Sequence, residues 1–269
     1  MVLMGKHNYF DRFRYILSDP LNEKIKRDKN SGEVIDGYLI MHNGLKIIPN
    51  SYYDNFSDIL RLNGGVHEPQ EEYVFNEIIE NLNSKTPLMI ELGAYWGFYS
   101  MSFLQKNTEG VSFLVEPDED FINIGKNHFE INGMVGNFIQ DFVGKNNFMI
   151  DSFVKNNSLS KINIVHCDIQ GHEYEMLLGS LDSIKNKIID YFFISTHSQN
   201  LHNICKDFLQ SNDYKIIGSA DFDNETFCHD GVLIATSIEN HKVFNLGNKS
   251  EMELISEDYL DKIINKKII

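Results

Sequence analysis

A carboxylate recurs along the middle of the chain at a nearly constant interval, each time at or near the end of a short apolar segment. The four residues are Glu91, Glu116, Asp141 and Asp168, which are 25, 25 and 27 positions apart. One strand, one helix and the two loops that join them need about that many residues. We therefore expect an α/β fold in which each acid lies near the carboxyl end of a strand, where such sheets bind their ligands.

The first unit of this pattern combines a strand, a turn and a helix. Leu88–Leu92 is an apolar run typical of a buried strand, and Phe98–Gln105 is typical of a helix. Gly93 and Gly97 bracket the turn, since glycine has no Cβ to clash with a ligand or a neighbouring backbone. Their four-residue spacing differs from the G-x-G-x-x-G pattern of dinucleotide-binding enzymes, so a dehydrogenase is disfavoured. Glu91, two residues before Gly93, indicates a ligand that carries a cation.

Three stretches of the chain resemble one enzyme family. Residues 91–97 (ELGAYWG) resemble motif I of the class I methyltransferases, and the alanine after Gly93 is similar to the FkbM family in particular. That family usually has asparagine where this chain has Tyr95. The strand end Val115-Glu116-Pro117 also resembles the family.

The third stretch is Asp168-Ile169-Gln170-Gly171-His172-Glu173. It resembles the Asp-hydrophobic-Glu-Gly-x-Glu pattern of FkbM methyltransferases, with Gln170 in place of the first glutamate. The resemblance covers about residues 65–237. It implies a class I methyltransferase fold, with a Rossmann-like mixed sheet and helices on both faces, and it implies S-adenosylmethionine as the cofactor.

Within this resemblance, several residues are expected at the cofactor. They are Glu68, Glu91, Gly93, Ala94, Tyr95, Gly97, Glu116, Asp141 and Asp168. Glu116 is placed to accept hydrogen bonds from the ribose hydroxyls. Asp141, or its neighbour Gln140, is placed to meet the adenine, and Glu91 to orient the turn or the methionine amine.

Catalysis is expected to involve histidine, because methyl transfer to an alcohol requires removal of a proton. His172, His197 and His229 all fall at the same sheet edge, and we favour His172, which follows the Asp168 strand directly. An alternative is a divalent cation held by Asp168 and His197, as in catechol-type O-methyltransferases, which would favour the alkoxide directly. The sequence leaves both mechanisms open.

The family methylates hydroxyl groups, often on sugars or polyketides. We therefore expect an O-methyltransferase that acts on a small molecule or saccharide, which includes nucleotide-activated sugars and polysaccharide precursors. The alternative is a non-catalytic domain that binds S-adenosylmethionine or S-adenosylhomocysteine as a sensor or scaffold. His172 and His197 count against that alternative, because they could supply a base.

The composition argues against several partners. A formal net charge of −15 repels phosphate backbones, so nucleic acid is not an expected partner. No stretch approaches eighteen apolar residues, and residues 1–10 lack the apolar centre of a signal peptide, so no membrane association is expected. Cys167, Cys205 and Cys228 match neither a disulfide framework nor a zinc site. These features predict a reduced, cytoplasmic protein of undetermined oligomeric state.

The N-terminal quarter is expected to be an extension of the methyltransferase domain. Val34–Met41 and Leu45–Ile48 are joined by a segment that contains Asn43-Gly44, which is typical of a two-residue hairpin turn. We assign residues 1–64 to this extension, with its β-hairpin and helices, and residues 65–269 to the methyltransferase domain. Glu71 and Glu72, in the first turn of the next helix, are interpreted as partners of the helix dipole.

Overall fold

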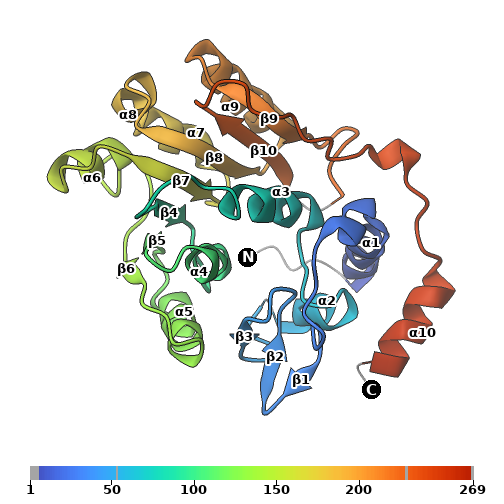
Figure 1. Cartoon of the computed structure of the whole chain (residues 1–269). Coiled ribbons are helices and arrows are strands. Elements are labelled where there is room, and N and C mark those ends of the chain that lie inside the picture. The colour runs from blue at the N-terminus through green and yellow to red at the C-terminus, as the bar shows by residue number, and fades with distance from the viewer. Residues whose placement is uncertain (1–5, 53, 228–229, 268–269) are drawn as a thin grey trace.

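The computed structural model describes residues 6–52, 54–227 and 230–267 and is built around a seven-stranded sheet (Figure 1). Its strands are β4 (Leu88–Leu92), β5 (Val111–Val115), β6 (Asn137–Ile139), β7 (Ile162–Cys167), β8 (Ile189–Thr196), β9 (Lys215–Ala220) and β10 (Gly231–Thr236). They are arranged in the order β6-β5-β4-β7-β8-β10-β9. β10 runs antiparallel to its neighbours β8 and β9, while the pairs among β4 to β8 are parallel. The predicted mixed α/β sheet is therefore confirmed.

Helices cover both faces of this sheet. On one face lie α3 (Pro69–Ile79), α4 (Phe98–Lys106) and α5 (Glu119–Ile131). On the other lie α6 (Ile150–Asn156), α7 (Glu173–Leu178), α8 (Leu181–Lys185) and α9 (Gln199–Ser211). Because side chains alternate across a strand, each strand contributes to both cores: Ile164 packs on the α3 side and Val165 on the α6 side.

The strand register sets polar side chains on a buried face. Glu91 of β4 pairs with His166 of β7, and His166 pairs with Phe193 of β8. All three follow the alternation that directs Met89 and Ile164 toward the core under α3 and α4. Glu91 and His166 are each 2% exposed, so charged groups lie within a hydrophobic layer and require partners.

The N-terminal extension contains the expected β-hairpin, but its tight turn lies elsewhere. The extension comprises α1 (Lys6–Ser18), η1 (Pro20–Lys24), β1 (Val34–Ile35), β2 (Tyr38–Ile40), β3 (Lys46–Ile47), η2 (Asp54–Ser57) and α2 (Asp58–Leu62). The two-residue turn with positive φ at both positions is Asp36-Gly37, at 52° and 84°, between β1 and β2. At Asn43-Gly44 only Gly44 has positive φ, so β2 and β3 are joined by a wider turn.

The chain returns to this extension at its C-terminal end. After η3 (Lys249–Glu251), α10 (Glu257–Lys267) packs against α1 and α2 (Figure 1). Leu260 of α10 is fully buried, and Arg14 of α1 donates a hydrogen bond from Nε to the Ile255 carbonyl at 2.8 Å. The boundary after residue 64 stays a prediction. None of the helices in the described ranges is both long and apolar enough to cross a membrane.

Candidate cofactor and active site

The turn after β4 holds the ends of two strands together. Gly93 has a φ of 71°, and a Cβ added there would lie 1.8 Å from the Asp168 carbonyl oxygen at the end of β7. Gly97 has a φ of 77° and precedes α4, where a Cβ would lie 2.8 Å from the ring of Phe129. Both positions therefore require glycine, and at Gly93 the approaching group is the backbone of the neighbouring strand end.

A cavity of about 370 Å³ opens beside this turn, at the carboxyl ends of β4, β5 and β7. Most of the expected cofactor residues line it, namely Glu68, Glu91, Gly93, Ala94, Tyr95, Glu116 and Asp168, together with His172. Gly97 and Asp141 do not line the cavity, although Phe142 and Val143 beside Asp141 do. His229 lies outside the described residues. These roles stay predictions.

One end of the cavity is apolar and suits a flat base. Pro117, Phe121, Phe142 and Val143 line it. Phe142 is 65% exposed, which is unusual for phenylalanine, and a ligand at this end would cover its ring.

Glu116 lines the cavity next to Pro117, where the ribose attached to that base would be bound. Its side chain is 6% exposed, and its two oxygens accept backbone hydrogen bonds from Tyr95 at 2.9 Å and Asp118 at 3.0 Å. Burial raises the pKa of this carboxyl group. Each oxygen retains a lone pair, so a sugar hydroxyl can still donate to it.

Two further carboxylates lie at the opposite end. Glu91 accepts the Ser100 backbone N–H at 2.9 Å, which caps the start of α4, and burial raises its pKa. Glu68 accepts the Tyr99 hydroxyl at 2.8 Å, and burial also raises the pKa of Glu68. With Asp168, these groups make this end of the cavity attractive to a cation.

Tyr95 adopts a left-handed conformation with φ of 47°, which asparagine tolerates better than tyrosine. Its hydroxyl donates to the Ser51 carbonyl at 3.0 Å, and its ring packs edge-on against Phe121 with centroids 4.3 Å apart. These contacts compensate the backbone strain and connect the N-terminal extension to the turn after β4.

His197 is enclosed by three carboxylates. Its Nδ1 lies 2.7 Å from Glu173 Oε1, and its Nε2 lies 3.3 Å from Asp168 Oδ1 and 3.4 Å from Asp230 Oδ1. Burial alone would lower the pKa of His197, but its hydrogen bonds with Asp168 and Glu173 outweigh it and raise the pKa to about 10. At neutral pH His197 is therefore a cation that positions carboxylates, which makes it a poor base.

His172 is placed differently. It precedes α7 at the helix N-cap position, its side chain is exposed, and it lines the cavity. Asp168 accepts the side-chain amide of Gln170 at 3.0 Å, so Gln170 contacts the same acid from within its own loop. As for the metal alternative, Asp168 and His197 do lie together, but the described residues contain no group of three His, Cys, Asp or Glu side chains arranged to hold an ion.

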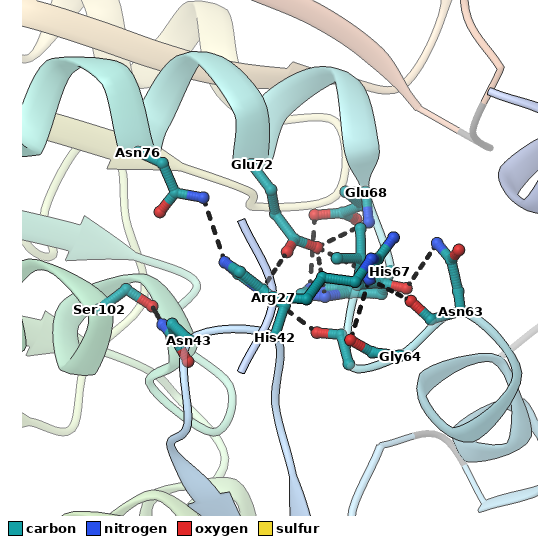
Figure 2. Close-up of polar contacts among 12 residues, drawn as sticks. Arg27, His42, Asn43, Asn63, Gly64, His67, Glu68, Glu72, Asn76 and Ser102 are labelled. Carbon is teal, nitrogen blue, oxygen red and sulfur yellow. Dashed lines mark hydrogen bonds and ion pairs between the residues drawn. The ribbon is translucent and has the colours of Figure 1, made fainter. Parts of the chain in front are cut away.

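A second set of ionisable residues, which sequence reasoning missed, lies under the cavity. His166 Nε2 is 3.0 Å from Glu71 Oε1, and Glu71 Oε2 accepts the Ser195 hydroxyl at 3.0 Å. Glu72 lies between His42 and His67, as Figure 2 shows. The sequence does concentrate acids and a histidine in residues 67–72. Their position at the start of a helix, however, offered a simpler explanation for them.

These residues fit S-adenosylmethionine: an apolar end for adenine, a carboxylate for the ribose hydroxyls and carboxylates for the cationic end. The METTL16 MTase domain is similar in fold, with 13% identity, a TM-score of 0.50 and coverage of 76% of this chain and 87% of that chain. A second crystal form of that domain aligns over 62% of this chain and 66% of its own length, with 13% identity and a TM-score of 0.47. M. capricolum TrmK, solved with S-adenosylhomocysteine, shows 18% identity, a TM-score of 0.42 and coverage of 72% of this chain and 84% of its own.

No curated protein sequence matches the chain significantly. The model of the methyltransferase FkbM domain, however, matches residues 52–216, which is more than half of the chain. That range includes the strand–turn–helix of Gly93, the Glu116 strand end and the Asp168 loop. The chain belongs to the FkbM family of S-adenosylmethionine-dependent methyltransferases.

Proposed function

We propose that this methyltransferase acts on a hydroxyl group of a saccharide or another small neutral molecule, with His172 as the base. The observation that carries the proposal is the difference between His172, which lines the cavity, and His197, which contacts the lining residue Asp168. His197 is held as a cation by Asp168, Glu173 and Asp230, whereas the exposed side chain of His172 lines the cavity. His172 is thus the described histidine best placed to take a proton.

The bound cofactor supplies an electrophilic methyl group on its sulfonium. The protein's residues would align the acceptor hydroxyl toward that methyl group, and an imidazole nitrogen of His172 would take the hydroxyl proton. His197, by holding Asp168, fixes the carboxylate beside the reacting groups.

Charge supports a neutral acceptor. Glu68, Glu91 and Asp168 line the cavity, and the whole chain carries a net charge of −15. Phosphorylated acceptors and nucleic acid would be repelled by this field. A saccharide without phosphate groups is therefore favoured over a nucleotide-activated sugar.

The test offers methyl-labelled S-adenosylmethionine to the enzyme with neutral saccharides, nucleotide sugars and RNA in parallel. We expect label in a neutral saccharide; label confined to RNA or to protein would contradict the proposal. With the accepted compound, His172→Gln should lower turnover by about 10²–10⁴-fold while the affinity for S-adenosylhomocysteine stays close to that of the wild type.

His241→Gln is the matched control, because His241 is only partly buried and does not line the cavity. It should retain wild-type turnover. Normal turnover in His172→Gln would rule His172 out as the base. Loss of turnover on chelation, restored by Mg²⁺ or Mn²⁺, would favour the metal mechanism instead.

A further inference from the structure

S-adenosylmethionine ends in an amino acid, so its site must accommodate a carboxylate as well as an ammonium group. The cavity offers the ammonium several partners, since Glu68, Glu91 and Asp168 all line it. The same acids repel a carboxylate. None of the described residues that line the cavity is lysine or arginine, so a histidine is the type of side chain in this lining that could give the carboxylate a positive partner.

His67 has the position and the free atom that this role needs. It lines the cavity and is 3% exposed, surrounded by the rings of Tyr52, Trp96 and Phe98. Its Nδ1 lies 2.8 Å from Glu72 Oε1. Its Nε2 is 3.7 Å from Glu68 Oε2, beyond hydrogen-bond distance, and so remains available to a ligand.

Glu72 fixes this ring. Its Oε1 accepts the backbone N–H groups of His67 at 2.8 Å and Glu68 at 2.9 Å. Its Oε2 lies 3.0 Å from His42 Nδ1, and the other ring nitrogen of His42 lies 3.1 Å from the Asn76 amide nitrogen (Figure 2). The carboxylate is therefore held at several points, and it turns Nδ1 of His67 away from the cavity.

The charges within the cluster favour the protonated form of His67. Burial alone would lower the pKa of His67, but Glu72 and then Glu68 outweigh it and raise the pKa. Burial alone would raise the pKa of Glu72, but His67 and His42 hold it well below its usual range. An imidazolium that pairs with Glu72 through Nδ1 retains the N–H on Nε2 as a donor.

His166, the other buried histidine that lines the cavity, is less suited. Its ring stacks against Tyr99 with centroids 3.9 Å apart, and its nearest charged partners, Glu71 and Glu91, lie on either side of it in the protein interior. The Nε2 of His166 is only 3.0 Å from Glu71 Oε1, whereas the Nε2 of His67 is 3.7 Å from Glu68 Oε2, so His67 is the histidine whose Nε2 has more room for a ligand.

We propose that His67 binds the methionine carboxylate of the cofactor through Nε2–H, with Glu72 positioning its ring. This inference rests on the cofactor and is independent of the acceptor. It assigns a binding role to a histidine outside the Gly93 turn and the Asp168 loop.

The experiment compares two ligands by calorimetry: S-adenosylhomocysteine and its decarboxylated analogue, which retains the amine but lacks the carboxylate. His67→Gln should weaken S-adenosylhomocysteine binding by about 10- to 100-fold, the usual range for a lost hydrogen bond to a charged group. Its affinity for the decarboxylated analogue should match that of the wild type. Glu72→Gln, which keeps the imidazole but removes its counter-ion, should show the same ligand-selective loss.

His241→Gln is the matched control, since His241 packs against Tyr191 and Phe244, makes no contact with Glu72 or His67 and does not line the cavity. It should bind both ligands as the wild type does. Equal losses for both ligands in His67→Gln and Glu72→Gln, or full S-adenosylhomocysteine affinity in His67→Gln, would overturn the proposal. Every variant in this experiment is tested for ligand binding alone. A failure of the His67 proposal can therefore be distinguished from an error in the proposed acceptor or in the proposed base.

Discussion

Gly93 is the residue at which the turn after β4 contacts the Asp168 loop. Its backbone donates an N–H to the Val115 carbonyl at 2.9 Å, so this one position touches the ends of three neighbouring strands, β4, β5 and β7. Glycine there is needed for assembly of the sheet edge as well as for ligand access.

Gly93→Ala should therefore be severe. The new Cβ would overlap the Asp168 carbonyl oxygen, a backbone atom that cannot move independently, and alanine would also have to adopt a positive φ. We expect a loss in the free energy of unfolding of about 3 kcal/mol or more, measured by urea denaturation.

Gly133→Ala supplies the control for backbone strain alone. Gly133 has a similar φ of 65°, but nothing lies within 4 Å of its added Cβ. It should cost about 1–2 kcal/mol. If the two variants unfold with the same free energy, the contact between Gly93 and Asp168 is not what requires glycine.

The location of residues near the cavity was easier to predict than their burial and their hydrogen-bond or ion-pair partners. Glu91, Glu116 and Asp168 could be placed at the cavity because strand ends follow from local apolar runs. Glu71 and Glu72 were interpreted as partners of the helix dipole, and their burial, with each 1% exposed, was not predicted. Their burial depends on histidines that are distant in the sequence, His166 for Glu71 and His42 for Glu72, and no local pattern records such pairings.

At the scale of elements, β3 is fastened to the methyltransferase sheet by the end of α5. Asn132, the residue after α5, accepts the Lys46 N–H at 2.9 Å and donates to the Lys46 carbonyl at 2.7 Å. His128 accepts the Ile48 N–H at 3.1 Å through Nε2. Burial lowers the pKa of His128 to about 4, so the ring stays neutral and able to accept. The hairpin was predictable from its sequence, but this docking was not, because it joins segments about 80 residues apart.

Asn132→Ala should destabilise the protein by about 1 kcal/mol, because both backbone groups of Lys46 lose their partner. The matched control is Asn157→Ala. Asn157 also follows a helix and donates to the carbonyl four residues earlier, as Asn132 does, but it makes no contact with a strand of the extension. Urea unfolding should show a larger loss for Asn132→Ala; equal losses would mean that the strand contact contributes nothing.

At the scale of the whole molecule, the regular spacing of acids was enough to predict a parallel sheet with its ligand edge. The order β6-β5-β4-β7-β8-β10-β9 was not predicted, because pairings between distant strands leave no local signal; the family resemblance implied only a Rossmann-like mixed sheet. The packing of α10 on α1 and α2 was likewise not expected, since an amphipathic helix shows which face it buries but not against what.

The central claim is that the cavity beside Gly93 binds the adenosyl cofactor, and calorimetry with S-adenosylhomocysteine tests it most directly. The wild-type protein should bind one equivalent and should not bind NAD. Glu116→Ala should weaken S-adenosylhomocysteine binding by about 1–3 kcal/mol, because the ribose hydroxyls lose their acceptor. A folded wild-type protein that fails to bind S-adenosylhomocysteine, or binds NAD equally well, would contradict the account.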